Sequence, residues 1–426
     1  MLLSELKNKR ILILGFGREG RDTLLFLKKK FPRQSFGIAD KQYSVSRGGE
    51  KRVAWHVGKN YLKAIPRYDV VVRSPGIPLS KIKPYLRNNQ KVTSQTALFF
   101  ANCPGTIIGI TGTKGKSTTS SLIYGALKQG LPAQAGEKRA YLVGNIETPS
   151  LSLLQKARKG DIFVYELSSF QLTGLRQSPH IAIVLNIFPE HLDHHGTLKE
   201  YLKAKSNISR FQKKEDIVIY DASNNYAKKI AQLSSGKKVP FRFKRNAEGL
   251  WVTSSEPVFL VGKILDIPKE TIAKAIRKFK PLAHRLEPAG TFHGIAFVND
   301  SASTNPASTM AALKTLGSRV HTLIAGGLDR GLSYRELSRE IEKSSVGFLI
   351  LFPDTGKKIL QGLKKNIPHH IVFGMKEAVR LSYSHTPKGK ICLLSPAAAS
   401  FNMFKNFKER GDQFKQYVLH HAKKNA

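Results

Sequence analysis

Cysteine is scarce in this chain of 426 residues, which contains only Cys103 and Cys392. The two stand in unrelated contexts, whereas a disulfide framework or a zinc site needs several cysteines or histidines at short spacing. We therefore expect neither kind of site. A chain without disulfides suits a reducing compartment, so we expect a cytoplasmic protein.

Long apolar runs are missing as well. No stretch of about 18 consecutive apolar residues occurs, so we expect no transmembrane helix and no membrane partner. The opening MLLSELKNKR puts its apolar residues ahead of its charges, and no small-residue cleavage site follows. This order is not that of a secretory signal.

Acidic residues are few: 30 Asp and Glu stand against 70 Lys and Arg, a formal net charge of +40. Such an excess can indicate nucleic-acid binding. The basic residues are dispersed, however, and no zinc-finger or RNP motif accompanies them, so we expect no specific nucleic-acid partner. A diffuse positive field would still attract anionic nucleotides.

What the chain does contain is a repeated alternation of short apolar strands and helical segments, which predicts an α/β fold. We expect three domains. Residues 1–104 predict a Rossmann-like N-terminal domain, residues 105–281 a central ATP-binding P-loop domain with a parallel sheet, and residues 282–426 a Rossmann-like C-terminal domain with an open sheet. The clearest expected strands are 11–14, 36–40, 69–76, 106–111, 161–167, 181–187, 294–300, 320–327, 347–353 and 390–396.

The strongest local motif is GITGTKGKST at 109–118. A strand precedes it and a helix follows, as a phosphate-binding P-loop requires. Its glycines let backbone N–H groups face a phosphate, Lys116 can reach the β- and γ-phosphates, and the hydroxyl of Ser117 can bind Mg²⁺. We predict that ATP is bound by Gly112, Thr113, Lys114, Gly115, Lys116, Ser117 and Thr118.

A second glycine-rich turn, Gly15-x-Gly17-x-x-Gly20, follows the first expected strand, and Asp40 stands twenty residues further on. This spacing is typical of dinucleotide-binding folds. Taken alone it suggests NAD, although no hydride-transfer site is visible.

Together these motifs resemble those of the Mur ligase superfamily, whose ATP loop usually has Asn where this chain has Lys114. The superfamily also contains folylpolyglutamate synthases, so the loop alone does not name a substrate. VYELSSFQL at 164–172 and NIFPEHLDHHGTLKEYLKAK at 186–205 are similar to the branch that adds D-glutamate to UDP-N-acetylmuramoyl-L-alanine.

This resemblance implies a site for two Mg²⁺ ions. Ser117 and Glu166 would bind one ion and His191 would help to bind the second. Lys205, in the spacing Tyr201-x-x-x-Lys205, would be carbamylated near that second ion. Lys116, His191 and Lys205 would then be the catalytic residues. Glu190 departs from the family, which usually has Asp before the His.

In the resembled branch, the N-terminal turn holds the UDP of the substrate, which we favour over NAD. SPGIP at 74–78 matches a turn that closes over this nucleotide. Glu147 replaces a family glycine in VGNIETP. The residues implied to contact the UDP-linked substrate are Arg18, Glu19, Asp40, Lys41, Ser74, Gly76, Asn145, Ser168 and Gln171.

In the C-terminal part, HRLE at 284–287 and FVNDSASTN at 297–305 match family segments that contact ATP, which implies roles for Arg285 and Asp300. The residues implied to hold D-glutamate are Thr304, Arg330, Ser400 and Phe407. Two departures stand out: Ala302 replaces the usual Lys, and residues 253–280 lack the family's adenine-contacting His-Asn-x-x-Asn segment.

The resemblance therefore implies a monomeric ATP-dependent amide ligase of peptidoglycan precursor synthesis, which works through an acyl phosphate. Its substrates would be UDP-N-acetylmuramoyl-L-alanine and D-glutamate. Two alternatives stay open. One is the same chemistry with another amino acid, or a folylpolyglutamate synthase-like ligase. The other is a basic nucleotide- or nucleic-acid-binding protein on an inactive ligase scaffold.

Overall fold

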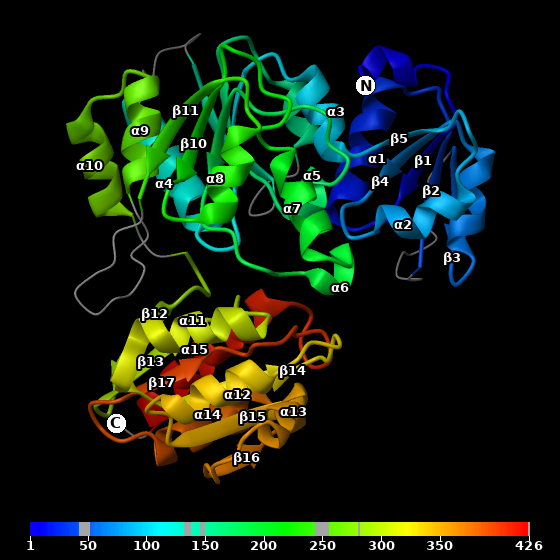
Figure 1. The fold of residues 1–426 in the computed structure, drawn as a ribbon. Helices are drawn as coiled ribbons and strands as arrows, with labels where there is room; N and C mark the ends of the chain where they lie inside the picture. Colours follow the sequence, from blue (N-terminus) through cyan, green and yellow to red (C-terminus); the bar gives the residue numbers. More distant parts are fainter. Residues whose placement is uncertain (42–51, 132–137, 145–149, 243–254, 280–281, 425–426) are drawn as a thin grey trace. The chain divides into compact units, whose positions relative to one another are not determined.

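The computed structural model describes residues 1–41, 52–131, 138–144, 150–242, 255–279 and 282–424. The described residues up to Phe279 form one compact unit, and those from Leu282 onward form a second (Figure 1). Both units are α/β, as the sequence predicts. Among the described residues, no helix is long and apolar enough to cross a membrane.

The N-terminal sheet of the first unit has five parallel strands in the order β3-β2-β1-β4-β5. This is the predicted Rossmann-type order, with β1 in the middle and fully buried because helices cover both faces. The strands are β1 (Ile11–Leu14), β2 (Phe36–Asp40), β3 (Val53–Val57), β4 (Val70–Arg73) and β5 (Lys91–Thr93), and the helices are α1 (Arg18–Lys30), α2 (Leu79–Ile82), α3 (Gln95–Asn102) and the 3₁₀ helices Leu3–Leu6, Tyr61–Arg67 and Lys83–Tyr85.

The central sheet, also in the first unit, has six parallel strands in the order β11-β10-β9-β6-β8-β7. Because β6 lies between β8 and β9, the loops that follow these three strands meet at one edge of the sheet. The strands are β6 (Thr106–Thr111), β7 (Ala140–Gly144), β8 (Ile162–Glu166), β9 (Ile181–Val184), β10 (Ile217–Asp221) and β11 (Lys237–Phe241).

The helices of the central part include the one expected after the P-loop and the one that carries Lys205. They are α4 (Lys116–Gly130), α5 (Ser169–Leu172), α6 (Leu192–His195), α7 (Leu198–Ser206), α8 (Asn225–Gln232), α9 (Glu256–Ile264), α10 (Lys269–Lys278) and the 3₁₀ helix Leu151–Gln155. In the segment that departs from the family, α9 and α10 pack against α4 and bury Val258, Val261 and Ile272.

One hydrophobic cluster runs through both sheets of the first unit. The ring of Phe99, on α3, meets Phe163 and Tyr165 of β8 edge-on, with centroids 5.2 and 5.6 Å apart. The expected boundary at 104/105 falls between β5 and β6, so it separates two sheets that share a core. Three domains with the expected boundaries stay a prediction.

The second unit has a six-stranded sheet in the order β12-β13-β17-β14-β15-β16. It is parallel except for an antiparallel edge pair, β12 and β13, and the Pro and Gly of β12 hid this strand from sequence patterns. Its elements are β12 (Glu287–Phe292), β13 (Ile295–Asn299), α11 (Pro306–Leu316), the 3₁₀ helix Gly317–Arg319, β14 (Val320–Gly327), α12 (Arg335–Lys343), β15 (Phe348–Asp354), α13 (Thr355–Gln361), β16 (His369–Ile371), α14 (Met375–His385), β17 (Ile391–Leu394) and α15 (Phe407–Lys424).

Candidate nucleotide and metal site

The P-loop is the turn between β6 and α4, and its shape depends on two glycines. Gly115 caps α4 in a left-handed conformation, with φ of 84°. A Cβ added to Gly112 would lie 2.7 Å from the Cβ of Leu185. The turn therefore presents backbone N–H groups at the start of a long helix, where the helix dipole favours an anion.

Polar side chains of the loop are already held in place. The Nζ of Lys116 donates to the carbonyls of Gly112 and Thr113, at 2.8 and 3.0 Å. The hydroxyl of Thr113 lies 3.0 Å from that of Tyr201, on α7. Ser117, in the first turn of α4, is 5% exposed. Lys116, predicted to bind phosphate, and Ser117, predicted to bind Mg²⁺, therefore lie in the same turn of the chain.

Glu166 is the last residue of β8, beside Ile110 of β6 in the sheet register, and it is 1% exposed. A buried carboxylate is costly unless it is compensated by charge or hydrogen bonds. Its position at the end of the strand next to the P-loop is the one predicted for a metal ligand.

Glu190 joins the P-loop to the segment after β9. Its Oε1 lies 3.2 Å from the Nζ of Lys114, and its Oε2 lies 3.6 Å from the Nε2 of His191. Burial opposes the ionisation of Glu190, but the charges of Lys114, His191 and Lys116 and the hydrogen bond from Lys114 outweigh it and lower the pKa of Glu190. His191 has φ of 57°, an uncommon conformation for a residue other than glycine.

Lys205, on α7, is the most unusual cation of the site, because it is almost fully buried. Its Nζ donates to the carbonyl of Gly112 at 3.0 Å and lies 3.3 Å from the hydroxyl of Thr111. Burial, with a smaller contribution from the charge of Lys116, holds the pKa of Lys205 well below its usual value. A lowered pKa increases the share of neutral amine at a given pH, and only the neutral amine is a nucleophile.

These residues suit Mg²⁺ only together with a nucleotide. Among the described residues, no group of three or more His, Cys, Asp and Glu side chains could hold a metal by itself. Mg²⁺ commonly uses one or two protein ligands and completes its shell with phosphate oxygens and water. Ser117 and Glu166 offer the oxygen ligands of such a site, and His191 offers an imidazole.

The N-terminal glycine turn is packed as tightly as the P-loop. A Cβ on Gly20 would lie 2.1 Å from the carbonyl oxygen of Gly15, which itself has φ of 91°. The carboxylate of Asp40 accepts from the N–H of Phe16 at 2.6 Å, and the hydroxyl of Ser74 donates to Gly15 at 2.9 Å. Asp40 and Ser74 thus fix the turn itself.

The other residues predicted to contact the UDP-linked substrate differ in their exposure to solvent and in their hydrogen bonds. Arg18 and Lys41 are exposed, and Arg18 donates to the carbonyl of Gly144 at 3.2 Å. Gly76 is exposed with open space around it. Glu19 turns its carboxylate inward, where it accepts from the Nε2 of Gln171 at 2.8 Å. Asn145 lies outside the described residues.

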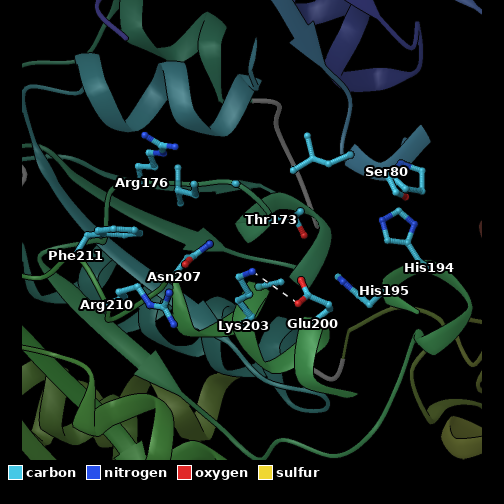
Figure 2. Close-up of a pocket in the computed structure, with 15 residues that line it drawn as sticks. Ser80, Thr173, Arg176, His194, His195, Glu200, Lys203, Asn207, Arg210 and Phe211 are labelled. Carbon is cyan, nitrogen blue, oxygen red and sulfur yellow. Dashed lines mark ion pairs between the residues drawn. The ribbon is translucent and has the colours of Figure 1, made fainter. Parts of the chain in front are cut away.

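A cavity of 530 Å³ lies beside α7, between residues 78–80 and 173–176 (Figure 2). It is lined by Arg176, Lys203 and Arg210 and by a single acid, Glu200, which lies 3.7 Å from Lys203. None of the residues predicted for ligand binding lines it.

The predicted ATP residues of the second unit differ in exposure. Arg285 is exposed on a turn between His284 and Leu286, which both have positive φ. Asp300 is 5% exposed, and its carboxylate accepts from the N–H of Leu286 at 3.2 Å and the hydroxyl of Ser395 at 2.8 Å. Burial raises the pKa of Asp300.

Two of the four predicted glutamate residues, Arg330 and Ser400, follow chain segments that meet at the end of β14. The N–H of Leu328 bonds to the carbonyl of Ala399 at 2.8 Å, which places the chain before Arg330 beside the chain before Ser400. Arg330 lies over the ring of Phe401, 5.6 Å from its centroid. Ser400 is buried, and Thr304 and Phe407 are partly exposed.

Sequence reasoning missed Arg410, which is completely buried in α15. Its guanidinium donates to the hydroxyl and carbonyl of Ser301, at 3.0 and 2.9 Å, and to the carbonyl of Ala398 at 3.1 Å. Burial lowers its pKa to about 9. A spacing of four residues from the buried Phe414 and Val418 was the available signal, since it places Arg410 on the inner face of the helix.

A parallel sheet with a glycine-rich phosphate loop at its carboxyl edge and a buried acidic residue on the next strand defines a P-loop nucleotide-binding protein. Comparison with known proteins gives the family. Residues 110–264 match the model of the Mur ligase middle domain. The UDP-N-acetylmuramoylalanine–D-glutamate ligase of Acetivibrio thermocellus is 32% identical, over 97% of each chain. The chain therefore belongs to the Mur ligase family.

Further relatives agree on the family and differ in the amino acid that they are named for. The UDP-N-acetylmuramoyl-L-alanine–L-glutamate ligase of Salinispora tropica is 33% identical, over 98% of this chain and 99% of its own. The fold is also that of the MurF ligase of Thermotoga maritima crystallised with ADP, with a TM-score of 0.60 and 14% identity over 100% of this chain and 98% of that one.

Proposed function

We propose that this chain is an ATP-dependent ligase that adds glutamate, in the D form, to UDP-N-acetylmuramoyl-L-alanine. One observation carries the proposal most directly: a buried lysine, Lys205, lies against the P-loop carbonyl of Gly112, beside the carboxylate-bearing end of β8. The two ligases that align along nearly the whole chain support it.

The proposed reaction transfers the γ-phosphoryl group of ATP to the substrate carboxylate, which gives an acyl phosphate and ADP. The glutamate amine then attacks the acyl carbon, and phosphate leaves as the amide forms. The P-loop N–H groups and Lys116 stabilise the charge on the transferred oxygens, for which Lys116 exchanges its contacts with loop carbonyls for contacts with phosphate.

Two Mg²⁺ ions would supply further charge neutralisation when bound with ATP. Ser117 and Glu166 would hold one, and His191 and Lys205 would lie by the second. We propose that the neutral amine of Lys205 adds to CO₂ and releases a proton, which forms a carbamate. The lowered pKa of Lys205 favours this step because only the unprotonated amine can add.

The remaining assignments follow the site. Asp40 and Ser74 would support UDP binding by fixing the glycine turn, and Arg18, Lys41, Gly76 and Asn145 would line the ligand. In the second unit, Arg285 and Asp300 would bind ATP. Arg330, an exposed guanidinium that matches carboxylate geometry, would bind glutamate with Thr304, Ser400 and Phe407. We expect a monomer and, because the reaction consumes ATP, a cytoplasmic site of action.

L-glutamate is the second candidate acceptor. One observation favours it: the relative named for L-glutamate has similar identity and coverage to the relative named for D-glutamate. Ala302, where the resembled family usually has Lys, leaves the choice of amino acid open. A panel of amino acids that includes both glutamate enantiomers, supplied with UDP-N-acetylmuramoyl-L-alanine and ATP, separates the candidates.

The proposal is tested with Lys116→Ala. Wild-type protein should release ADP over many turnovers only when both the muramoyl substrate and glutamate are present, and the variant should lose this turnover. Undiminished turnover by the variant would refute the assigned role of the P-loop. Salt-sensitive DNA binding without ADP release from the wild type would favour the inactive-scaffold alternative instead.

A further inference from the structure

We infer that Glu19 and Arg73 are positioning residues that couple the N-terminal nucleotide turn to the ATP and metal site. They act through residues 166–173, called the α5 segment below, which contain Glu166 at one end and Thr173 at the other. The inference rests on the proposed function, because the proposed function assigns the UDP-linked substrate to the glycine turn and ATP with Mg²⁺ to the P-loop site.

The first link is a hydrogen bond between side chains of two helices, α1 and α5. The carboxylate of Glu19, in the first turn of α1, accepts from the Nε2 of Gln171 at 2.8 Å. The Oε1 of Gln171 in turn accepts from the N–H of Ser168 at 3.0 Å. Both ends of the Gln171 amide are therefore held, so Glu19 fixes the orientation of a side chain that is predicted to contact the substrate.

The second link is made by Arg73, the last residue of β4, which is buried. Its Nη1 donates to the carbonyls of Pro75 and Ile77, at 3.2 and 2.6 Å, and so holds the SPGIP turn. Its Nη2 donates to the carbonyl of Thr173 at 3.1 Å. One guanidinium thus ties the turn expected to close over UDP to the end of the α5 segment.

The α5 segment is also bonded to the strand that leads into the P-loop. The N–H of Leu167 donates to the carbonyl of Ile110 at 2.8 Å, and the hydroxyl of Thr111 donates to the carbonyl of Leu167 at 2.9 Å. Hydrogen bonds therefore tie the α5 segment to the glycine turn and the SPGIP turn on one side and to the P-loop strand on the other, and the backbone of the segment connects them to Glu166.

Packing alone does not account for Glu19. Its Oε2 is inaccessible to solvent and has no hydrogen-bond partner among the described residues. Such an atom costs folding free energy, and an apolar side chain of similar size would avoid the cost. A carboxylate can accept the hydrogen bond from Gln171, which an apolar side chain cannot do.

The consequence is linkage between ligands. A nucleotide that orders the glycine and SPGIP turns also orders the α5 segment, so the second ligand meets a site that is already arranged. Linkage is reciprocal, and coupling of this kind typically changes affinity by about 5-fold or more. We therefore expect the muramoyl substrate to raise the affinity for ATP, and ATP to raise the affinity for the substrate by the same factor.

The test measures binding of UDP-N-acetylmuramoyl-L-alanine by calorimetry, with and without a non-hydrolysable ATP analogue and Mg²⁺. The wild type should show coupling of about 5-fold or more. Glu19→Ala should bring the factor towards one while affinity for the ATP analogue alone stays within about 2-fold. Glu19→Gln, which keeps the side-chain volume, should give an intermediate factor and guards against misfolding of the smaller variant.

Ser152→Ala is the matched control. Ser152 donates a hydrogen bond to Asp22 and so also links the central part of the first unit to α1, through a bond that does not involve the α5 segment. This variant should keep the wild-type factor. Wild-type coupling in both Glu19 variants would overturn this inference and leave the proposed function intact. A wild type that binds both ligands without coupling would do the same. A wild type that does not bind the muramoyl substrate would refute the proposed function.

Discussion

The Nζ of Lys114 lies 3.2 Å from the Oε1 of Glu190, so two of the positions at which the chain departs from the pattern of the resembled family contact each other. Lys114 stands in the P-loop where Asn is usual, and Glu190 stands before His191 where Asp is usual. The side chain of Glu190 is one methylene longer than that of Asp, and it reaches the positive charge of Lys114. The pair connects the phosphate loop to the residue that is predicted to bind the second metal.

Replacing Lys114 by Met should weaken ATP binding by roughly 5- to 30-fold, because Glu190, 12% exposed, loses its main counter-charge beside the phosphates. The measurement is the KM for ATP. Lys114→Met combined with Glu190→Gln should be less impaired than the sum of the two single changes, with a coupling of about 0.5–3 kcal/mol. Strictly additive effects would show that the ion pair has no role.

Gly20→Ala should abolish binding of the UDP-linked substrate, because the new Cβ would lie 2.1 Å from the carbonyl oxygen of Gly15 and displace the turn. Gly125→Ala, on α4 and outside the turn, is the matched control, since a Cβ added there would have nothing within 4 Å. Binding of UDP-N-acetylmuramoyl-L-alanine to each variant is measured by calorimetry. Equal losses in both variants would show that the close approach of Gly20 to Gly15 is not what binding requires.

The carbamate of Lys205 makes activity depend on dissolved CO₂. Protein that has been degassed and assayed in CO₂-free buffer should lose most of its turnover, and added bicarbonate should restore it. Lys205→Ala should be inactive with or without bicarbonate. Full activity of the wild type after thorough removal of CO₂, together with an intact-protein mass that lacks the carbamate, would contradict carbamylation.

Arg410 should be a large contributor to the stability of the second unit. Arg410→Met leaves the buried carbonyls of Ser301 and Ala398 without their donor, at a cost of about 2–4 kcal/mol, or roughly 5–10 °C in the thermal midpoint. Lys408→Met changes an exposed side chain of the same helix and should cost no more than about 0.5 kcal/mol. Similar midpoints for the two variants would mean that the guanidinium does not stabilise this unit.

Sequence patterns predicted the elements that local chemistry determines. Apolar runs such as 11–14 and 106–111 became central parallel strands, and the glycines before α1 and α4 formed the expected turns. Edge strands were missed, for example β11 with its lysines and β16, whose residues are all exposed. Such strands lack the apolar pattern because little of their surface is buried.

Contacts between distant residues were beyond sequence reasoning for a different reason. The resemblance implied that Glu19, an acid in the first turn of a helix, contacts the UDP-linked substrate. Only the packing of the two sheets shows that it reaches Gln171, 152 positions away. The meeting of Lys114 with Glu190 likewise depends on β6 and β9 being neighbours, which the linear order of strands does not state.

The proposed ligase activity is tested most directly by product analysis. Wild-type protein is incubated with ATP, Mg²⁺, UDP-N-acetylmuramoyl-L-alanine and either D- or L-glutamate, and the UDP-linked products are identified by mass spectrometry alongside the release of ADP. We predict one new amide and one ADP for each D-glutamate consumed, and neither product with Lys116→Ala. Release of ADP without a UDP-linked amide for any amino acid, or a clear preference for an acceptor other than glutamate, would contradict the proposed activity.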